Sequence, residues 1–204
     1  MRSILLTTVA VMLVACGGGL KRDAPEPAVY RLAPPAVAGG PAIVADLLVL
    51  RPVVVTGLRT DRIANSWPGN RLDYYAGARW SGELGSVVQG ALVQAFRGSG
   101  RLRAVEGDPG RFRATHVLGV EVVRLEADYS AGGVPTAKAT LAATVARNGD
   151  RRALMTTTVS TETVAGGNTL STVAAALDDS FGKAASEVVV RTHDAVAADL
   201  ASQP

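Results

Sequence analysis

Few side chains in this sequence can do chemistry, and a cysteine is the first that needs an explanation. The chain has 204 residues, with one cysteine and two histidines. A single thiol cannot form an intramolecular disulfide, and these three residues are too few for a zinc cluster. Cys16 follows an apolar run, Ile4 to Ala15, and precedes three glycines. Its role must therefore come from its position in the chain.

The segment before Cys16 has the form of a secretory signal, with a short basic start and an apolar stretch of 12 residues. It is shorter than the roughly 20 apolar residues that cross a bilayer as a helix. Residues 13–16, Leu-Val-Ala-Cys, resemble a bacterial lipobox, in which the cysteine is acylated and becomes the first residue of the mature protein. We therefore expect residues 1–15 to be a lipoprotein signal peptide and Cys16 to be the lipidation site. The alternative is an ordinary signal peptide with an incidental cysteine.

Acylation at Cys16 would decide the location of the protein. Two or three acyl chains, at about 0.8 kcal/mol per buried methylene, hold a protein stably on a membrane. In bacterial lipoproteins an aspartate just after the cysteine commonly retains the protein in the inner membrane, whereas Gly17 and Gly18 follow here. The resemblance implies an outer-membrane lipoprotein that faces the periplasm.

The remaining reactive residues form no catalytic signature. The sequence has no Gly-x-Ser-x-Gly elbow, no phosphate-binding Gly-x-x-x-x-Gly-Lys loop and no His-Glu-x-x-His pair. His116 falls in an expected strand and His193 in an expected helix, and neither has a signature nucleophile near it in sequence. We expect a protein that is not an enzyme, with no catalytic residues, metal or cofactor. A hydrolase assembled from distant residues is the alternative.

The charge of the mature chain argues against nucleic acid as a partner. Loss of residues 1–15 removes Arg2, which leaves 20 basic and 18 acidic side chains and a formal charge of +2. The arginines are scattered among aspartate and glutamate, whereas nucleic-acid binding requires a basic stripe.

Aromatic and arginine side chains gather between residues 62 and 80, RIANSWPGNRLDYYAGARW. The segment holds four of the nine aromatic residues of the chain, interleaved with three arginines. Such side chains are the usual anchors of protein interfaces. The pattern leads to the hypothesis that four residues contact a partner: Arg62, Tyr74, Arg79 and Trp80. The alternative is that the rings fill the core of an alanine-rich domain.

The elements that position these residues begin after a linker. Residues 16–41 contain five of the ten prolines and little periodic pattern, although residues 28–32 have the character of a short edge strand. Residues 42–204 are expected to form the periplasmic domain. Its first strand, residues 43–55, is expected to bend near Pro52.

A loop is expected next, at residues 56–70, and an extended segment at residues 72–80. Residues 83–97 have the clearest helical period, with apolar side chains on one stripe. Ser81 is the expected N-cap, and the glycines of residues 98–100 are expected to end the helix.

The sequence pattern in the second half of the domain predicts an antiparallel meander of three strands and a final helix. A short strand at residues 101–105 is followed by three extended segments, at about 115–129, 136–147 and 151–164. Asn148-Gly149 is a strong hairpin signal and is expected to join the last two segments. From Thr169 onward the pattern is helical, and charged residues recur on it at four-residue spacing: Asp179, Lys183, Glu187 and Arg191. We interpret this ladder as a solvated helix face, with a partner site as the alternative. The order of elements predicts an α+β fold, a single domain whose antiparallel sheet carries two main helices packed on one face.

Three motifs connect the sequence to a known family: residues 60–64, TDRIA, residues 72–80, LDYYAGARW, and residues 99–105, SGRLRAV. With the lipobox and the helix between them, they closely resemble the ABC-type transport auxiliary lipoproteins, the PqiC-like proteins that accompany Mce-domain lipid transporters. One departure is visible, because the family often shows prolines where residues 81–83 stand here.

The resemblance implies a lipoprotein that docks the periplasmic channel of an Mce-type ABC lipid transporter at the outer membrane. The implied partners are an Mce-domain protein and, through the acyl chains, the outer membrane. An outer-membrane assembly lipoprotein that supports lipopolysaccharide export is the alternative within non-enzymes. The transported lipid, contact with cargo, the face that binds the partner, and the choice between monomer and homo-oligomer stay open.

Overall fold

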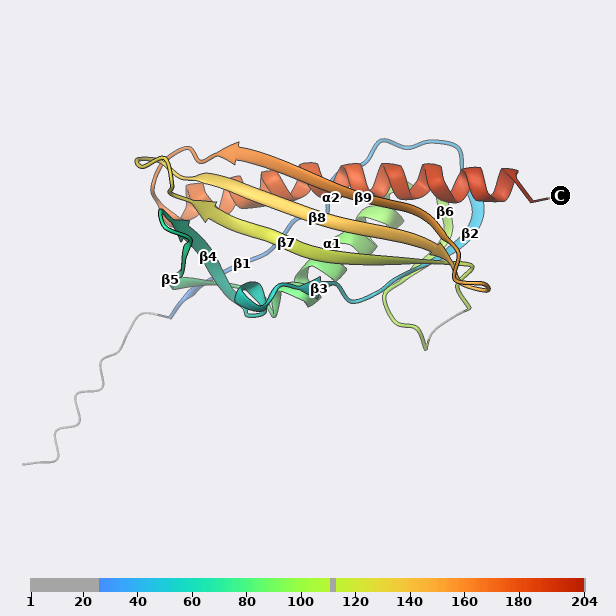
Figure 1. The fold of residues 1–204 in the computed structure, drawn as a ribbon, viewed down its shortest axis with the longest axis horizontal. Helices are drawn as coiled ribbons and strands as arrows, with labels where there is room; N and C mark the ends of the chain where they lie inside the picture. Colours follow the sequence, from blue (N-terminus) through green and yellow to red (C-terminus); the bar gives the residue numbers. More distant parts are fainter. Residues whose placement is uncertain (1–25, 111–112, 204) are drawn as a thin grey trace, which may run out of the picture.

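The fold is given by a computed structural model that describes residues 26–110 and 113–203. Residues 1–15 and Cys16, the expected signal peptide and lipidation site, lie outside the described residues. The strands are β1 (Ala28–Tyr30), β2 (Ile43–Val49), β3 (Val53–Val54), β4 (Arg62–Trp67), β5 (Arg71–Trp80), β6 (Leu102–Glu106), β7 (His116–Asp128), β8 (Thr136–Arg147) and β9 (Ala153–Val164). The helices are α1 (Leu84–Ser99) and α2 (Leu170–Ala201), and a 3₁₀ turn, η1, spans Thr56–Leu58 (Figure 1).

The 13-residue strand β7 organises the sheet. Along one edge it pairs with β8 in antiparallel fashion over almost its whole length. Its other edge is shared by three shorter strands, all parallel to it: β2 near its start, β3 at its middle and β4 at its end. Pro52 and the turn η1 divide these three strands. Pro52 has no N–H to donate to the sheet, which explains the first break.

The predicted α+β class is confirmed, and the sheet is mixed rather than antiparallel throughout. The expected meander, β7-β8-β9, is antiparallel. Strands β2 and β6 pair in parallel, as do β1 and β5. Parallel neighbours require a connection that returns the chain to the same end of the sheet. Helix α1, which follows β5 and precedes β6, lies on the path that leads from β2 back to its parallel neighbour β6.

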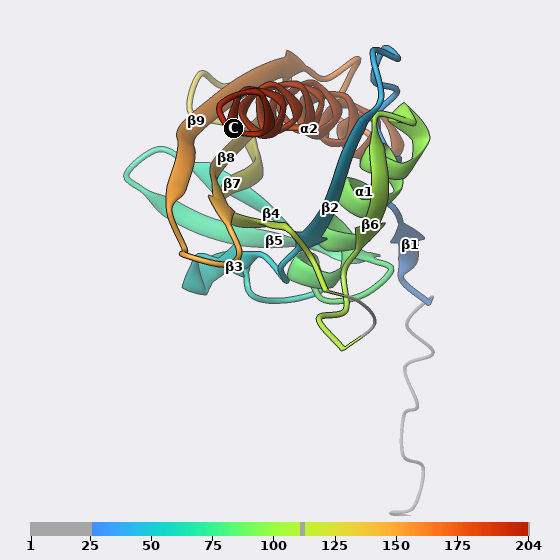
Figure 2. The same ribbon diagram turned by 90° about the vertical axis from the view of Figure 1, so that its right-hand side faces the viewer.

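Both helices pack against this curled sheet and touch each other. The 32-residue helix α2 lies within the curl of β7, β8 and β9, whereas α1 lies beside β2 and β6 (Figure 2). The predicted apolar stripe of α1 is buried, with Leu92 fully enclosed. Within the described part of the chain, no helix combines the length and apolarity needed to span a bilayer.

The helix ends match the sequence in part. Gly100 ends α1 in the left-handed region, with φ 65°, a conformation that glycine adopts without strain. Thr169 caps α2 by accepting a hydrogen bond from the N–H of Thr172. The expected N-cap of α1 was wrong: Glu83 stands there rather than Ser81, and no side chain caps the helix. Both helices nevertheless occur where the sequence predicted them.

Two segments are more ordered than a loop or linker. The expected loop at residues 56–70 contains η1 and the whole of β4. Within the expected linker, β1 forms the predicted short edge strand and pairs with β5. Beyond it Leu32 is buried, and the N–H of Ala33 donates to the carboxylate of Asp178 on α2 at 2.7 Å. Residues 28–33 are therefore fastened to both the sheet and the final helix.

Candidate functional site

The aromatic and arginine segment forms an antiparallel hairpin within the sheet, β4–β5, which we call the ribbon and whose base carries two of the predicted docking residues. Arg62 on β4 and Arg79 on β5 are opposite each other in the antiparallel register, and both are exposed. The Arg62 guanidinium lies 4.3 Å from the centre of the Tyr74 ring, within the range of a cation–π contact. The structure thus brings Arg62, Tyr74 and Arg79 together on one ribbon.

The two aromatic residues among the predicted docking residues, Tyr74 and Trp80, are less exposed than the two arginines. Tyr74 is half-buried, and its hydroxyl donates to the carbonyl of Gly57 at 2.6 Å. Trp80 is only 2% exposed and belongs to the core. Including Trp80 in a docking surface was therefore wrong, because Ala78 and Trp80 alternate inward at the end of β5.

A second aromatic group lies nearer the tip of the ribbon and joins two rings of the segment to Tyr129. The Trp67 ring stacks on Tyr129, with 4.6 Å between ring centres and 8° between ring planes. The Tyr129 hydroxyl lies 2.9 Å from that of Tyr75, and burial raises the pKa of Tyr75 far above its ordinary value. The Arg71 guanidinium lies 5.1 Å from the Trp67 ring centre. Tyr129 comes from the turn after β7, so no local spacing could have indicated this contact.

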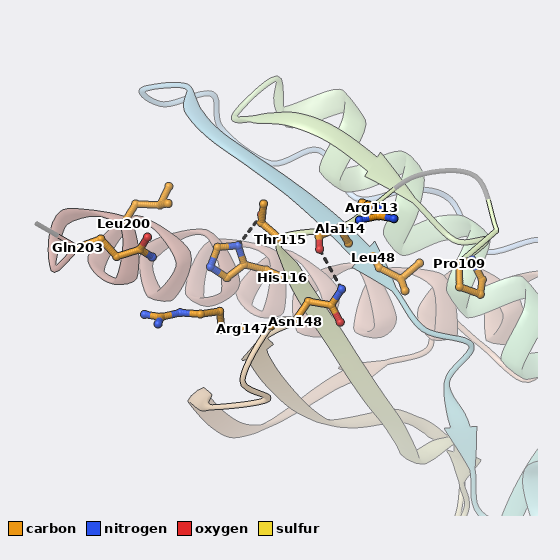
Figure 3. A pocket seen from close by; sticks show the side chains of 11 residues that line it. Leu48, Pro109, Arg113, Ala114, Thr115, His116, Arg147, Asn148, Leu200 and Gln203 are labelled. Carbon is orange, nitrogen blue, oxygen red and sulfur yellow. Dashed lines mark hydrogen bonds between the residues drawn. The ribbon is translucent and has the colours of Figure 1, made fainter.

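A pocket of about 630 Å³ opens at the other end of the sheet, where β2, β7 and the end of α2 meet (Figure 3). Its wall includes Thr115, His116 and Arg147. The Thr115 hydroxyl lies 2.9 Å from Nδ1 of His116, and Nε2 of His116 lies 3.2 Å from the buried carboxylate of Asp199. Hydroxyl, imidazole and carboxylate follow one another in the order that many hydrolases use.

The partners of these groups give the arrangement a structural role. The Thr115 hydroxyl accepts the backbone N–H of Asp46 at 3.0 Å and lies 3.1 Å from the carbonyl of the same residue. The Arg147 guanidinium donates to both carboxylate oxygens of Asp199. These hydrogen bonds from Arg147 are the main reason why the pKa of Asp199 falls to about 2. The network, which we call the His116 clamp (Thr115, His116, Arg147 and Asp199), fastens β2, β7, β8 and α2 together.

The other histidine is also internal. His193 is buried on α2, with Nδ1 3.6 Å from the carboxylate of Asp194. Over residues 26–110 and 113–203, no three His, Cys, Asp or Glu side chains are grouped so as to hold a metal ion.

Comparison with known proteins gives the same family as the motifs of residues 60–105. The model of a family described as the ABC-type transport auxiliary lipoprotein component matches residues 30–189. The chain belongs to this family. The match includes the whole β4–β5 ribbon and both helices up to residue 189. This auxiliary lipoprotein is thus a lipoprotein component of an ABC-type transport system, as the resemblance implied.

Solved structures give the same result for the fold. The crystal structure of protein XCC0632 from Xanthomonas campestris, of family DUF330, is 25% identical to the auxiliary lipoprotein, with a TM-score of 0.78 over 86% of this chain and 99% of that one. A hypothetical protein, CT253 from Chlamydia trachomatis, is 12% identical, with a TM-score of 0.54 over 76% of this chain and 99% of that one. A search of curated proteins finds no match.

Proposed function

We propose that this auxiliary lipoprotein is a non-enzymatic, periplasm-facing component of an Mce-type ABC lipid transport system. Acyl chains on Cys16 hold it at the outer membrane, where it docks the transport channel. The observation that carries the proposal is the family match over residues 30–189, and the lipobox of residues 13–16 supports the anchor.

The base of the ribbon is the proposed docking surface. Arg62 and Arg79 are like charges directly opposite each other on neighbouring strands, which is destabilising unless an anion compensates them. A guanidinium keeps its charge and binds a carboxylate with two parallel hydrogen bonds. The surface therefore fits an acidic patch on the Mce-domain protein.

Binding of the purified Mce-domain protein to an Arg62→Ala/Arg79→Ala variant tests this surface. Removing interface anchors commonly costs about 2 kcal/mol or more, so we expect a rise in Kd of about thirtyfold. A matched control, Arg113→Ala/Arg152→Ala, removes two exposed arginines at the other end of the sheet and should leave Kd unchanged.

Both variants should unfold within a few degrees of the wild-type temperature, because the charges on exposed side chains contribute at most about 1 kcal/mol to stability. A folded Arg62→Ala/Arg79→Ala variant with wild-type affinity would place the docking surface elsewhere. Absence of any binding by the wild-type protein would instead contradict the proposed partner.

A further inference from the structure

One end of the molecule is formed by three turns that carry almost no charge. They are the tip of the β4–β5 ribbon (residues 67–72), the β7–β8 turn (residues 129–135) and the connection from β9 to α2 (residues 164–169), which we call together the apolar end. Among these 19 residues only Arg71 is charged. Figure 1 shows all three at the left of the molecule.

Direct contacts join the three turns. The Trp67 ring stacks on Tyr129, whose backbone N–H donates to the carbonyl of Ser66 at 2.8 Å. The N–H of Ala165 donates to the carbonyl of Pro135 at 3.0 Å. The turns therefore form one continuous surface.

Large apolar side chains are exposed on this surface. The exposed fractions are 36% for Trp67, 38% for Leu72, 43% for Val134 and 69% for Val164. The indole N–H of Trp67 already donates to the Asn65 side chain at 2.6 Å, so the ring can enter less polar surroundings without losing a hydrogen bond.

The opposite end of the sheet differs sharply in charge. In the turn between β8 and β9, residues 147–152, four of six residues are charged. Burial of that end in a bilayer surface would require the desolvation of several charges, which is costly. The apolar end carries no such penalty beyond that of Arg71.

The N-terminal segment approaches from the same side. Strand β5 begins at the ribbon tip and runs away from it, and β1 is parallel to β5 with Ala28 opposite Ala78. The chain that leads into β1 therefore comes from the direction of the apolar end. Ala78 is seven residues from Arg71, or roughly 23 Å along a strand. The segment from Cys16 to Ala28 can span roughly 40 Å, which is long enough to reach the plane of the tips.

We propose that the apolar end rests on the phospholipid bilayer that holds the acyl anchor, with Trp67 and Leu72 among the headgroups. Tryptophan is favoured at the membrane interface because its ring is apolar with one polar edge. Arg71, beside Trp67, is placed to bind a lipid phosphate. The proposal rests on the proposed anchoring at Cys16, and it gives the tethered domain a fixed orientation.

The two tryptophans of the chain provide the test, because Trp80 is buried and only Trp67 can meet lipid. The protein is purified from membranes and reconstituted into vesicles of phosphatidylethanolamine and phosphatidylglycerol whose acyl chains carry bromine, a quencher of tryptophan emission. We expect quenching of the wild-type emission relative to unbrominated vesicles. We expect no quenching for Trp67→Phe, which retains only Trp80.

A matched control places the probe at the charged end. Arg152 is exposed in the β8–β9 turn, so Trp67→Phe/Arg152→Trp should stay unquenched on the same vesicles. Quenching of this variant, or equal emission of the wild type on brominated and unbrominated lipid, would overturn the proposal. A change in Trp67 emission on addition of the Mce-domain protein, with no change on addition of lipid, would also overturn the proposal, in favour of a protein contact.

The outcome does not depend on native acylation. If mass spectrometry finds no acyl groups on the purified chain, the proposed anchor has failed, and the thiol of Cys16 is then coupled to a maleimide lipid in the same vesicles. Quenching of Trp67 in that arrangement still supports the apolar end as a membrane contact, and its absence still refutes it.

Discussion

Replacing Asp199 by asparagine should reveal how much the His116 clamp contributes to stability. The Asp199 side chain is 3% exposed and accepts hydrogen bonds from Arg147 and His116. Its pKa falls from 3.8 to about 2, mainly through the hydrogen bonds from Arg147. At about 1.4 kcal/mol per pH unit, this difference corresponds to about 2 kcal/mol of folding free energy. Asparagine keeps the shape of the side chain and removes its charge.

The sign of the effect follows from the lowered pKa. The unfolded chain binds a proton at Asp199 more tightly than the folded protein does, so the contribution is complete above pH 4 and is lost as pH falls toward 2. Asp199→Asn should therefore lower the free energy of unfolding by about 2 kcal/mol at pH 7. The gap between the wild type and the variant should narrow between pH 4 and pH 2.

Urea denaturation of both proteins, followed by circular dichroism at several pH values, measures this gap. Asp128, whose pKa Lys138 also helps to lower to about 2, is present in both proteins, so its titration cancels in the difference. A gap that is the same at pH 7 and pH 2.5 would show that the charge of Asp199 does not stabilise the fold. A gap near zero at pH 7 would show that the clamp contributes nothing net.

Three further predictions concern the anchor, the core and a helix end. Cys16→Ser should leave an uncleaved precursor that is missing from the outer-membrane fraction, and mature protein in that fraction would refute the lipobox assignment. Leu92→Asp should lower the free energy of unfolding by several kcal/mol and unfold the domain. Lys183→Ala, which removes one exposed ion pair with Asp179, should lower it by well under about 1 kcal/mol. Equal melting temperatures of the two variants would contradict this difference. Gly100→Ala should cost about 1 kcal/mol in urea denaturation because φ is 65° there, and an unchanged midpoint would argue against the left-handed helix end.

Local patterns in the sequence predicted the elements whose causes are local. The apolar stripe of α1 and the glycine at its end each act within a few residues, and so does the helical pattern that begins at Thr169. The β8–β9 hairpin also formed at Asn148-Gly149, although the positive φ lies at Arg151. The family match confirmed the resemblance carried by the ribbon motifs.

The pairing of segments that lie far apart in the chain could not be predicted from local sequence patterns. Nothing in the composition of β7 shows that three short strands share one of its edges, because strand periodicity reports which face is buried and not which neighbour pairs, or in which direction. Trp80 had the residue type of an interface anchor, and only its place at the inward end of β5 shows that it is core. The same holds for His116, whose partner Asp199 lies far along the chain.

The parallel pairing of β1 with β5 has a mechanical consequence. A pull on the chain before Ala28 from the side of the apolar end acts along the strand axis, so the bonds between β1 and β5 are loaded in shear and resist together. A pull across the sheet would break them one after another. The buried Leu32 and the bond from Ala33 to Asp178 resist any slippage that follows. The segment of residues 28–33 therefore holds best against force from the direction in which an anchored lipoprotein would be pulled.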